Sequence, residues 1–354
     1  MKTLLMVPLL AGALSCASAP PPGAEDLLHD LELDGGPGGA VLVSRDGSVV
    51  FTRTFGLADL EQGIPITEAT NFRLASVTKQ FTATAILILV ERGDLALDQP
   101  IKEFFPDLAP AARGIPIRHL LTHHSGIVAY EDLIADTATI PVLDRDVLRL
   151  VLPVDNTYFA PGSDYRYSNT AYALLALIVE HTSGISFAEF LKKEIFGPLG
   201  MDGTVAFQQG HSTVQDRAFG CSPDPDQPGT YVKTDQSMTS SVLGDGGIYS
   251  SIRDLSIWNN ALASGSVLSA PTLHQMLSPQ VAIDQGTRWY GLGWYIRAVG
   301  RDTVTFHGGS TVGFRTYILR IPASSSAVIA LFNRSDVDPE PLAWKLAQVF
   351  DLLP

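Results

Sequence analysis

The chain has 354 residues, of which 45% are hydrophobic and 17% are charged, and its formal net charge is -13. This composition is typical of a folded globular protein, and the length predicts two domains or one large domain with an insertion. The acidic balance argues against a nucleic-acid partner and against adhesion to anionic lipid, because both need a basic face on the protein.

Residues 1–19 have the pattern of a secretory signal peptide, with one lysine, an apolar core and then small residues. Two cleavage patterns compete. The letters ASA at 17–19 fit the small-x-small rule, although Pro20 would follow the cut. The letters LSC at 14–16 instead resemble a bacterial lipobox, in which residues 1–15 are removed and Cys16 is lipidated. We therefore expect an exported protein, either a periplasmic or cell-envelope lipoprotein or a plain secreted protein. Its only membrane contact would be a lipid anchor at Cys16.

The rest of the chain offers neither a disulfide nor a membrane span. Cys221 is the only cysteine besides Cys16, so no internal disulfide is expected and the fold depends on its core. After the signal, no apolar run approaches the roughly 18–20 residues needed to cross a bilayer.

Taken in chain order, the patterns predict strands near both ends and helices between them. A Pro/Gly-rich acidic tether with a short helix (20–38) leads into a β-hairpin that turns at Asp46-Gly47. A helix then begins near Ser76 and ends at Gly93, which suits a C-cap. The later helices are predicted at 143–151, 170–183, 186–195, 252–263 and 338–352, and the later strands at 289–299, 302–309, 313–322 and 325–335.

This order favours an α+β fold rather than alternating β and α units. We expect one antiparallel sheet built from both chain ends, with flanking helices, in an α/β domain of residues 24–100 plus 266–354. A mostly helical domain of residues 101–265 would be inserted into it. A cleft between the two parts is a usual place for a small-molecule site.

Ser76 and Lys79 lie three residues apart at the start of the apolar helix, so both side chains face the same way. A serine hydroxyl is a weak nucleophile and needs a base beside it. Burial of Lys79 would lower the pKa of its amine towards a useful base. The unpaired N–H of Ser76 at the helix start could hold an oxyanion. Ser-x-x-Lys alone is a weak signal, because a chain of this length contains the pattern by chance.

Two further patterns follow in the chain. Tyr167-Ser168-Asn169 is the only Tyr-x-Asn, and His307-Gly308-Gly309 lies on a predicted strand. The segment 124–126 also matches His-x-Gly, but it precedes the tyrosine motif and lies in a predicted loop. His119 and His123 have the spacing of a metal pair, yet no Glu-flanked zinc motif is present, so we interpret them as hydrogen-bonded structural residues.

The ordered set Ser-x-x-Lys, Tyr-x-Asn and His-x-Gly resembles the serine β-lactamase and penicillin-binding-protein superfamily. It is most similar to the branch of class C β-lactamases, DD-peptidases and esterases. The flanking stretches HLLTHHSGI, PGSDYRYSN and GDGGIYSSIRDLSIW are also similar to that branch, and the resemblance covers residues 30–352. It implies a β-lactamase/transpeptidase-like fold and an acyl-enzyme mechanism that needs no cofactor and no metal.

By this resemblance Ser76 is the acylated nucleophile, and Lys79 holds or takes its proton. Tyr167 acts as general base and then passes a proton to the leaving group. Asn169 binds a substrate amide, although it could also cap the helix that follows it. We expect Lys79, together with His307 if that ring is protonated, to lower the pKa of the Tyr167 phenol.

The third motif completes the predicted site. His307 takes the place where many relatives carry lysine, and the N–H groups of Ser76 and Ser310 form the oxyanion hole. Gly308 and Gly309 would let a substrate lie along the strand edge. A histidine is mostly neutral near pH 7, whereas a lysine would pair with the carboxylate of a β-lactam. Arg315 is expected on the surface or in the cleft, where it could bind a substrate carboxylate.

The sequence therefore predicts a cell-envelope serine hydrolase that is acylated on Ser76 and acts on a small-molecule or peptide substrate. Its bond would be the amide or ester of a D-amino-acid peptide, a peptidoglycan stem or a short-chain ester, with weak or no β-lactamase activity. The alternatives are a class C-like β-lactamase and a penicillin-binding module that deacylates slowly. An α/β-hydrolase is disfavoured because Gly-x-Ser-x-Gly does not occur.

Overall fold

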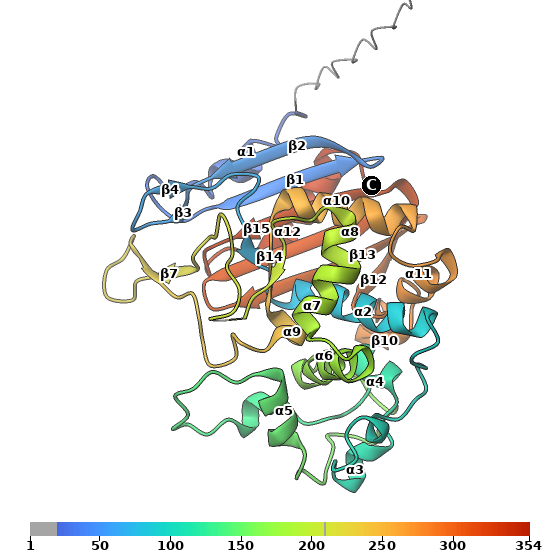
Figure 1. The fold of residues 1–354 in the computed structure, drawn as a ribbon. Helices are drawn as coiled ribbons and strands as arrows, with labels where there is room; N and C mark the ends of the chain where they lie inside the picture. The colour runs from blue at the N-terminus through green and yellow to red at the C-terminus, as the bar shows by residue number, and fades with distance from the viewer. Residues whose placement is uncertain (1–19, 209) are drawn as a thin grey trace, which may run out of the picture.

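The computed structural model describes residues 20–208 and 210–354 (Figure 1). The predicted signal peptide and Cys16 lie outside the described residues. An eight-stranded sheet runs through the molecule in the order β10-β11-β12-β13-β14-β15-β1-β2, and every neighbouring pair is antiparallel. The first strand, β1, thus pairs with the last strand, β15, so both chain ends build one sheet, as predicted. The strands are β1 (Gly39–Arg45), β2 (Ser48–Phe55), β10 (Val281–Ile283), β11 (Arg288–Tyr290), β12 (Tyr295–Val299), β13 (Asp302–Thr311), β14 (Phe314–Ile321) and β15 (Ser326–Phe332).

The hairpin between β1 and β2 turns at Asp46-Gly47, as predicted. Asp46 has φ 51° and Gly47 has φ 76°. Two successive positive φ angles define a type I′ turn, whose twist matches that of the flanking strands. This turn places Arg45 of β1 opposite Ser48 of β2, and the register of the two strands then shifts between Val43 and Ser44.

The segment 289–299 forms two strands rather than the single predicted strand. β11 and β12 are antiparallel, with Tyr290 opposite Tyr295. Gly293 between them has φ +81°, and a Cβ there would lie 2.9 Å from the Lys79 carbonyl oxygen. The chain therefore reverses at a point where only glycine fits against the helix that carries Lys79.

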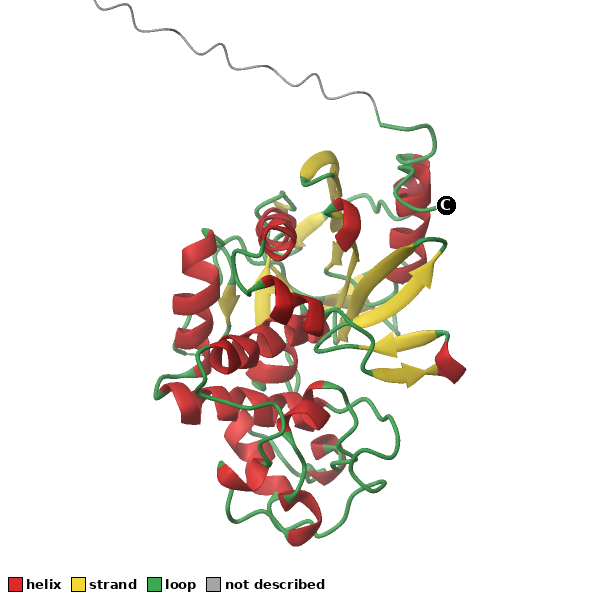
Figure 2. Ribbon diagram, turned by 90° about the vertical axis from the view of Figure 1, so that its right-hand side faces the viewer, coloured by secondary structure: helices red, strands yellow, loops and turns green. Residues whose placement is uncertain are grey.

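Helices cover both faces of the sheet (Figure 2). One face packs α1 and α12 against apolar residues of β1, β13, β14 and β15, and the other face meets the larger helical layer around α2, α6 and α10. The helices are α1 (Asp26–His29), α2 (Lys79–Glu91), α3 (Pro110–Arg113), α4 (Ile117–Leu121), α5 (Asp144–Val151), α6 (Asn169–Ser183), α7 (Phe187–Leu191), α8 (Gly197–Leu199), α9 (Leu243–Gly246), α10 (Ile252–Ser264), α11 (Ala270–Met276) and α12 (Pro339–Val349).

α2 lies at the centre of this arrangement. Every residue from Lys79 to Leu89 is buried, because the helix is packed by its neighbours on all sides. The predicted helices at 143–151, 170–183 and 252–263 are present as α5, α6 and α10, and the last predicted helix is α12. The predicted helix at 186–195 is interrupted, since α7 continues into a π-helical segment, η4 (Lys192–Phe196). The proposed division into two domains stays a prediction. α10 lies within the predicted helical domain of residues 101–265, and it packs against β1 and β15 of the sheet.

Short elements that the patterns did not predict connect these layers. They include the 3-10 turns η1 (Ala75–Thr78), η2 (Ile101–Glu103), η3 (Tyr130–Leu133), η5 (Asp284–Gly286) and η6 (Pro322–Ser324). Three small sheets pair β3 (Leu57–Asp59) with β4 (Ile64–Pro65), β5 (Phe72–Arg73) and β6 (Val205–Ala206) with β9 (Ile248–Ser250), and β7 (Cys221–Pro223) with β8 (Tyr231–Lys233).

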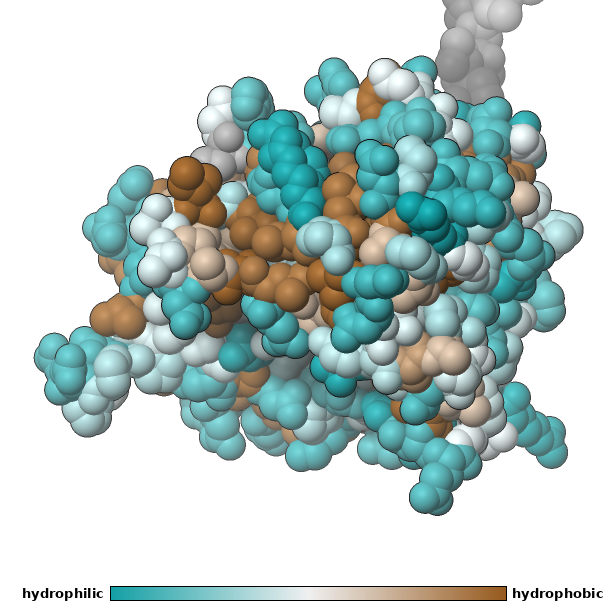
Figure 3. All heavy atoms as spheres, turned by 90° about the horizontal axis from the view of Figure 1, so that it is seen from below, coloured by the Kyte–Doolittle hydropathy of each residue, from teal (hydrophilic) through white to brown (hydrophobic). Residues whose placement is uncertain are grey.

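The lower end of the molecule, on which α3 and α5 lie, gathers apolar side chains in the middle of its surface (Figure 3). Ile140, in the loop before α5, is 80% exposed. In the part of the chain that the structure describes, no single helix is long and apolar enough to span a bilayer. The bent pair of α6 with the segment Phe187–Leu199 meets the length and composition test, but most residues of α6 are buried in the protein core.

Candidate active site

Ser76 lies in the 3-10 turn η1, between β5 and α2. The residue before it, Ala75, has φ +49°, a conformation that side chains other than glycine rarely adopt. Thr316 on β14 donates a hydrogen bond of 2.7 Å to the carbonyl of Leu74 and so fixes the turn to the sheet. A strained residue held by its surroundings next to a candidate nucleophile is typical of active sites.

Gly309 allows this turn to approach β13. A Cβ on Gly309 would lie 2.2 Å from the Leu74 carbonyl oxygen and 2.3 Å from the Thr316 hydroxyl. The prediction gave this glycine a role in admitting substrate to the strand edge. Its observed role is to bring η1, with Ser76, directly against the strand that carries Ser310.

Lys79 is fully buried, one turn after Ser76, as its spacing predicted. Its Nζ lies 3.2 Å from Ser76 Oγ and donates hydrogen bonds of 2.8 Å to Asn169 Oδ1 and to the Asp245 carbonyl oxygen. Burial lowers the pKa of Lys79 to about 8, and the carboxylates of Asp245 and Glu131 oppose that decrease. The amine is therefore close to the nucleophile and titrates within reach of neutral pH.

Tyr167 lies on the other side of the Lys79 amine, whose Nζ is 4.8 Å from the centre of the phenol ring. The side chain keeps some exposure to the cleft. The protein around it raises the pKa of Tyr167 well above its usual value, although a hydrogen bond with Ser76 acts in the opposite direction. The prediction that its pKa is lowered is therefore wrong, and the resting residue is a neutral phenol.

His307 is buried on β13. Its ring centre lies 6.2 Å from that of Tyr167 and 5.2 Å from that of Tyr295. Its Nδ1 lies 2.7 Å from the Gly308 carbonyl oxygen, so Nδ1 carries the proton and Nε2 accepts a 3.1 Å hydrogen bond from the Tyr290 hydroxyl. Burial and the nearby Lys79 charge lower the pKa of His307 to about 3. The ring is neutral, so it adds no positive charge that could favour a Tyr167 phenolate.

His123 lies directly beside Tyr167, and the sequence did not predict this. The two rings have centroids 4.2 Å apart, and the ring of Tyr290 is 4.6 Å from His123 on its other side. His123 has φ +58°, and its Nδ1 accepts a hydrogen bond of 3.0 Å from the Ser168 N–H. The motif around His123 therefore positions the loop that presents Tyr167, in keeping with the predicted structural role.

Asn169 has both halves of its amide occupied by protein groups. Its Oδ1 accepts from Lys79, and its Nδ2 donates a hydrogen bond of 2.7 Å to Glu131 Oε1. The cap of α6 is Ser168, whose side chain accepts from Ala171 N, so the suggestion that Asn169 caps this helix is wrong. In this arrangement Asn169 links Lys79 to Glu131, and it also lines the cleft.

Asp245 and Glu131 are site residues that the sequence analysis missed. Asp245 is buried at the end of α9, accepts a 3.1 Å hydrogen bond from the Tyr130 hydroxyl, and has a pKa that burial raises to about 6 while Lys79 opposes the increase. The stretch GDGG that contains it was noticed only as part of the resemblance. Nothing in the spacing of these two acids marked them as neighbours of Lys79.

Ser76 lines both a cleft and a smaller recess. A cleft of about 480 Å³ lies along β13, and a small recess of about 80 Å³ lies on the side of Glu131 and Asp245. β12 pairs with β13 only up to Phe306, so the segment His307–Thr311 has one edge without a partner strand. The cleft is lined by Ser76, Tyr167, Asn169, Arg288, Tyr295, Phe306, His307, Gly308, Gly309, Ser310, Arg315, Thr316, Tyr317, Asp338, Pro339 and Glu340.

All the predicted site residues within the described chain line this cleft except Lys79, which is buried and contacts Ser76 and Asn169. Arg315 lines it too, although its Nη1 donates to the carbonyls of Val312 and Phe314. The ring of His119 meets the ring of His124 edge to face, with ring centroids 5.4 Å apart. Among the described residues, no group of three His, Cys, Asp or Glu side chains could hold a metal ion.

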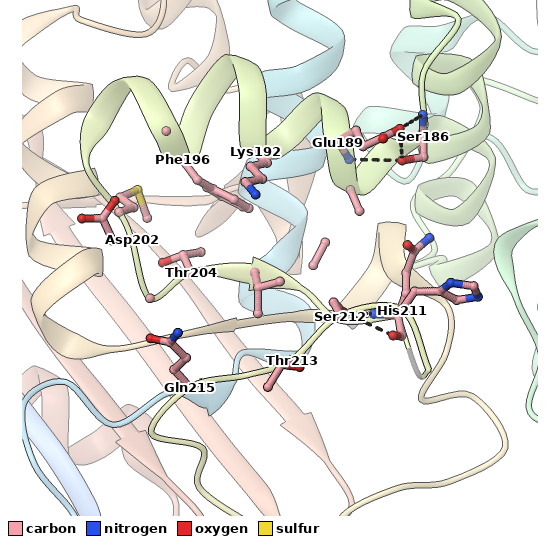
Figure 4. A pocket seen from close by; sticks show the side chains of 17 residues that line it. Ser186, Glu189, Lys192, Phe196, Asp202, Thr204, His211, Ser212, Thr213 and Gln215 are labelled. Carbon is pink, nitrogen blue, oxygen red and sulfur yellow. Dashed lines mark hydrogen bonds between the residues drawn. The ribbon is translucent and has the colours of Figure 1, made fainter.

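A second cavity of about 590 Å³ lies away from these residues, between α7 with η4 and the segment after α8 (Figure 4). Lys192 and Phe196 of η4 border it on one side, and Thr204, His211 and Gln215 border it on the other. None of the predicted site residues lines this cavity.

Comparison with known proteins agrees with this geometry. A family model described as Beta-lactamase matches residues 29–350. The chain is 30% identical over 326 residues to penicillin-binding protein 4* of Bacillus subtilis, covering 88% of this chain and 71% of that protein. It is 31% identical over 311 residues to a D-aminopeptidase of Gluconobacter oxydans, covering 84% of this chain and 56% of that protein. The chain thus spans little more than half of this D-aminopeptidase.

Solved structures give the same result. The octameric penicillin-binding protein homologue from Pyrococcus abyssi superimposes with a TM-score of 0.83 at 29% identity, covering 93% of this chain and 77% of that one. The D-amino acid amidase from Ochrobactrum anthropi SV3, complexed with L-phenylalanine amide, gives 0.79 at 26% identity, covering 93% and 98%. The chain therefore belongs to the beta-lactamase family and is a serine hydrolase of the superfamily that contains serine β-lactamases and penicillin-binding proteins.

Proposed function

We propose that this chain is an exported, cell-envelope hydrolase that is acylated on Ser76 and cleaves the amide of small D-amino-acid amides or peptides. The observation that carries the proposal is the contact of Ser76, Lys79 and Asn169 beside a cleft with an open strand edge. The names of the D-aminopeptidase and D-amino acid amidase relatives support the substrate class. Export and lipidation of Cys16 rest on the N-terminal pattern alone.

In the proposed acylation, a neutral Lys79 amine takes the proton of Ser76 Oγ as that oxygen attacks the substrate carbonyl. A pKa of about 8 leaves part of the amine neutral near pH 7 to 8, so this step needs no further base. The N–H groups of Ser76 and Ser310 would bind the oxyanion. The tetrahedral intermediate then collapses and the C–N bond breaks.

Tyr167 is proposed to supply the proton for the leaving nitrogen. Its raised pKa keeps the phenol protonated at rest, and Ser76 Oγ, which contacts both Tyr167 and the Lys79 amine, is proposed to relay a proton from Lys79 back to the phenol afterwards. In the second half of the reaction water attacks the acyl-enzyme, with the same two groups acting in reverse. Tyr167 is thus an acid first, rather than the initial base that the resemblance implied.

The recess beside Ser76 supports a substrate with a free α-ammonium group. Glu131 and Asp245 line this recess together with Arg73, whose guanidinium donates to the carbonyls of Gly246 and Ser240. Asn169 holds the Glu131 carboxylate in place. A substrate ammonium within a few ångströms of a carboxylate in a partly enclosed site gains a charge-assisted hydrogen bond. An N-acylated substrate would lose that interaction.

The test compares D-alanine p-nitroanilide, its N-acetyl derivative and the L-enantiomer in the wild type, Glu131→Gln and Asp132→Asn. Glutamine keeps an oxygen for Asn169 but has no charge. Asp132 is an adjacent exposed carboxylate that bonds to Tyr158 instead. We expect Glu131→Gln to lower kcat/KM for the free-amine substrate by about tenfold or more, and Asp132→Asn to change little.

A uniform loss on both the free-amine and the N-acetyl substrates would contradict the role of Glu131. Turnover of none of the three by wild type, together with ester hydrolysis that depends on Ser76, would refute the substrate class while keeping the nucleophile.

The second candidate is a penicillin-binding module that deacylates slowly, which the similarity to penicillin-binding protein 4* favours. A penicillin adduct on Ser76 that persists without amide turnover would support that candidate. We propose weak or no β-lactamase activity, because His307 is neutral.

A further inference from the structure

Arg320 on β14 is a buried guanidinium without an acidic partner. It is 1% exposed. Its Nε donates a 2.7 Å hydrogen bond to Asn259 Oδ1, and its Nη2 donates to the Asn259 carbonyl oxygen at 3.3 Å. No hydrogen-bond partner among the described residues meets its Nη1. Burial alone lowers its pKa, to about 9, so no neighbouring carboxylate opposes the loss of charge, and the group stays protonated at neutral pH.

Two other buried polar groups near this cation also have no partner in the part of the chain that the structure describes. Thr305 is directly opposite Arg320 on β13, and its hydroxyl is buried and unpaired. The Arg320 guanidinium lies 5.5 Å from the ring centre of Trp294, whose indole N–H is also buried and unpaired. Three such groups at one place are unusual, because buried polar atoms nearly always have a partner.

The register extends this row across the sheet. Arg320 is opposite Ala327 on β15, and Ala327 is opposite Ser44 on β1, whose hydroxyl is a further buried atom without a partner. Residues opposite each other in antiparallel strands share a face of the sheet. Ala327 contributes only a methyl group between the two polar side chains, and α10 covers this face through its packing on β1 and β15.

The chemistry of these atoms selects the ligand. Arginine and the tryptophan indole can only donate hydrogen bonds, and serine and threonine hydroxyls can rotate to donate. A buried charge that remains uncompensated costs several kcal/mol. A water molecule could fill the hydrogen bonds but would leave the charge in place. A small anion satisfies the donors and neutralises the guanidinium.

We propose that Arg320, Trp294 and Thr305 form an internal site for a monovalent halide, chloride under ordinary conditions, between the sheet and α10. The site is separate from the catalytic cleft, since none of its residues lines that cleft. Its anion binds the folded protein and not the unfolded chain, so occupancy stabilises the fold. The proposal is independent of the substrate that Ser76 attacks.

The first test measures thermal unfolding in sodium chloride and in sodium gluconate of equal ionic strength. We expect chloride to raise the Tm of the wild type by a few degrees. Thr305→Val keeps the shape of the side chain but removes its hydroxyl, and it should reduce that shift. Thr182→Val is the matched control, because Thr182 on α6 also has a buried hydroxyl without a partner among the described residues and is not part of the proposed site.

The second test locates the ion directly. A crystal grown in sodium bromide should show an anomalous peak in contact with Arg320 Nη1 and Trp294 Nε1. Ordered water without an anomalous peak would overturn the proposal, as would equal Tm values in the two salts or an undiminished chloride shift in Thr305→Val. Arg320→Met should abolish both signals if it folds, and the threonine variant keeps the test valid if it does not.

Discussion

The exchange Gly309→Ala tests how the sheet positions the nucleophile. The added Cβ would lie 2.2 Å from the Leu74 carbonyl oxygen and 2.3 Å from the Thr316 hydroxyl, which are hydrogen-bonded to each other. Real Cβ atoms essentially never come closer than 3.0 Å to such atoms, so the strand and the η1 turn must separate by close to an ångström. The backbone carbonyl cannot rotate away without releasing the turn before Ser76.

Two magnitudes follow from this geometry. Overpacking of this kind costs about 1–3 kcal/mol, which corresponds to a fall in Tm of roughly 1–4 °C for a chain of this size. A shift of about 1 Å between the Ser76 and Ser310 N–H groups should lower kcat/KM on the order of 10²-fold. We expect both effects in one variant, because one displacement causes them.

Gly308→Ala is the matched comparison for stability. Its Cβ would point to the opposite face and meet the Tyr317 ring at 3.2 Å, a contact that a ring can relieve. Thermal unfolding of the two variants and hydrolysis of a D-amino-acid amide by Gly309→Ala are the assays. Unchanged Tm and kcat/KM in Gly309→Ala would refute the reasoning, as would a larger loss of Tm in Gly308→Ala.

Three further predictions concern the charges and caps around the site. The wild-type kcat/KM should rise with pH through about 8, because only neutral Lys79 takes the serine proton. Asp245→Asn should move that rise to lower pH, because it removes a carboxylate that raises the pKa of Lys79. A rise that stays in place or moves to higher pH would contradict this assignment. Tyr167→Phe should lower kcat by a factor on the order of 10³, measured with an activated ester and an amide. The loss should be larger for the amide, because its leaving group needs a proton. Full turnover of the amide would show that another residue acts as the acid. Ser168→Ala should lower the free energy of unfolding by about 1 kcal/mol in a denaturant titration, because it removes the cap of α6, and no change in the midpoint would count against that role.

Local patterns predicted the parts of the fold that local rules determine. Asp46-Gly47 has the preferred residues of a two-residue turn, and the hairpin formed in that register. The helices α5, α6 and α10 each have a strong start signal or a long apolar run. The return of the late strands to β1 followed from the strands at both ends, and the antiparallel order of the sheet confirms it.

Elements that depend on tertiary contacts were not predicted. The segment 289–299 was interpreted as one strand, but Gly293 allows a reversal against the Lys79 carbonyl. The strands β5, β6 and β9 have two or three residues each, and they exist only because distant segments pair. No periodicity can be recognised over so few residues.

The motifs predicted which side chains meet at the cleft, but not their electrostatic state. Ser76, Lys79, Tyr167 and Asn169 converge because the ordered motifs belong to one family pattern. The pKa of Tyr167 depends on how deeply the protein buries the phenol, which a sequence does not reveal. The predicted direction of its pKa shift was therefore wrong. Asp245 is distant in sequence from every motif residue, and only the fold brings it next to Lys79.

The central claim is that Ser76 is the residue that becomes acylated. The most direct measurement is the intact mass of wild type and Ser76→Ala after brief exposure to a penicillin, followed by peptide mapping. We expect a mass gain equal to the whole penicillin in the wild type alone, located on the peptide that contains Ser76. An adduct on another residue, or an equal gain in Ser76→Ala, would contradict it.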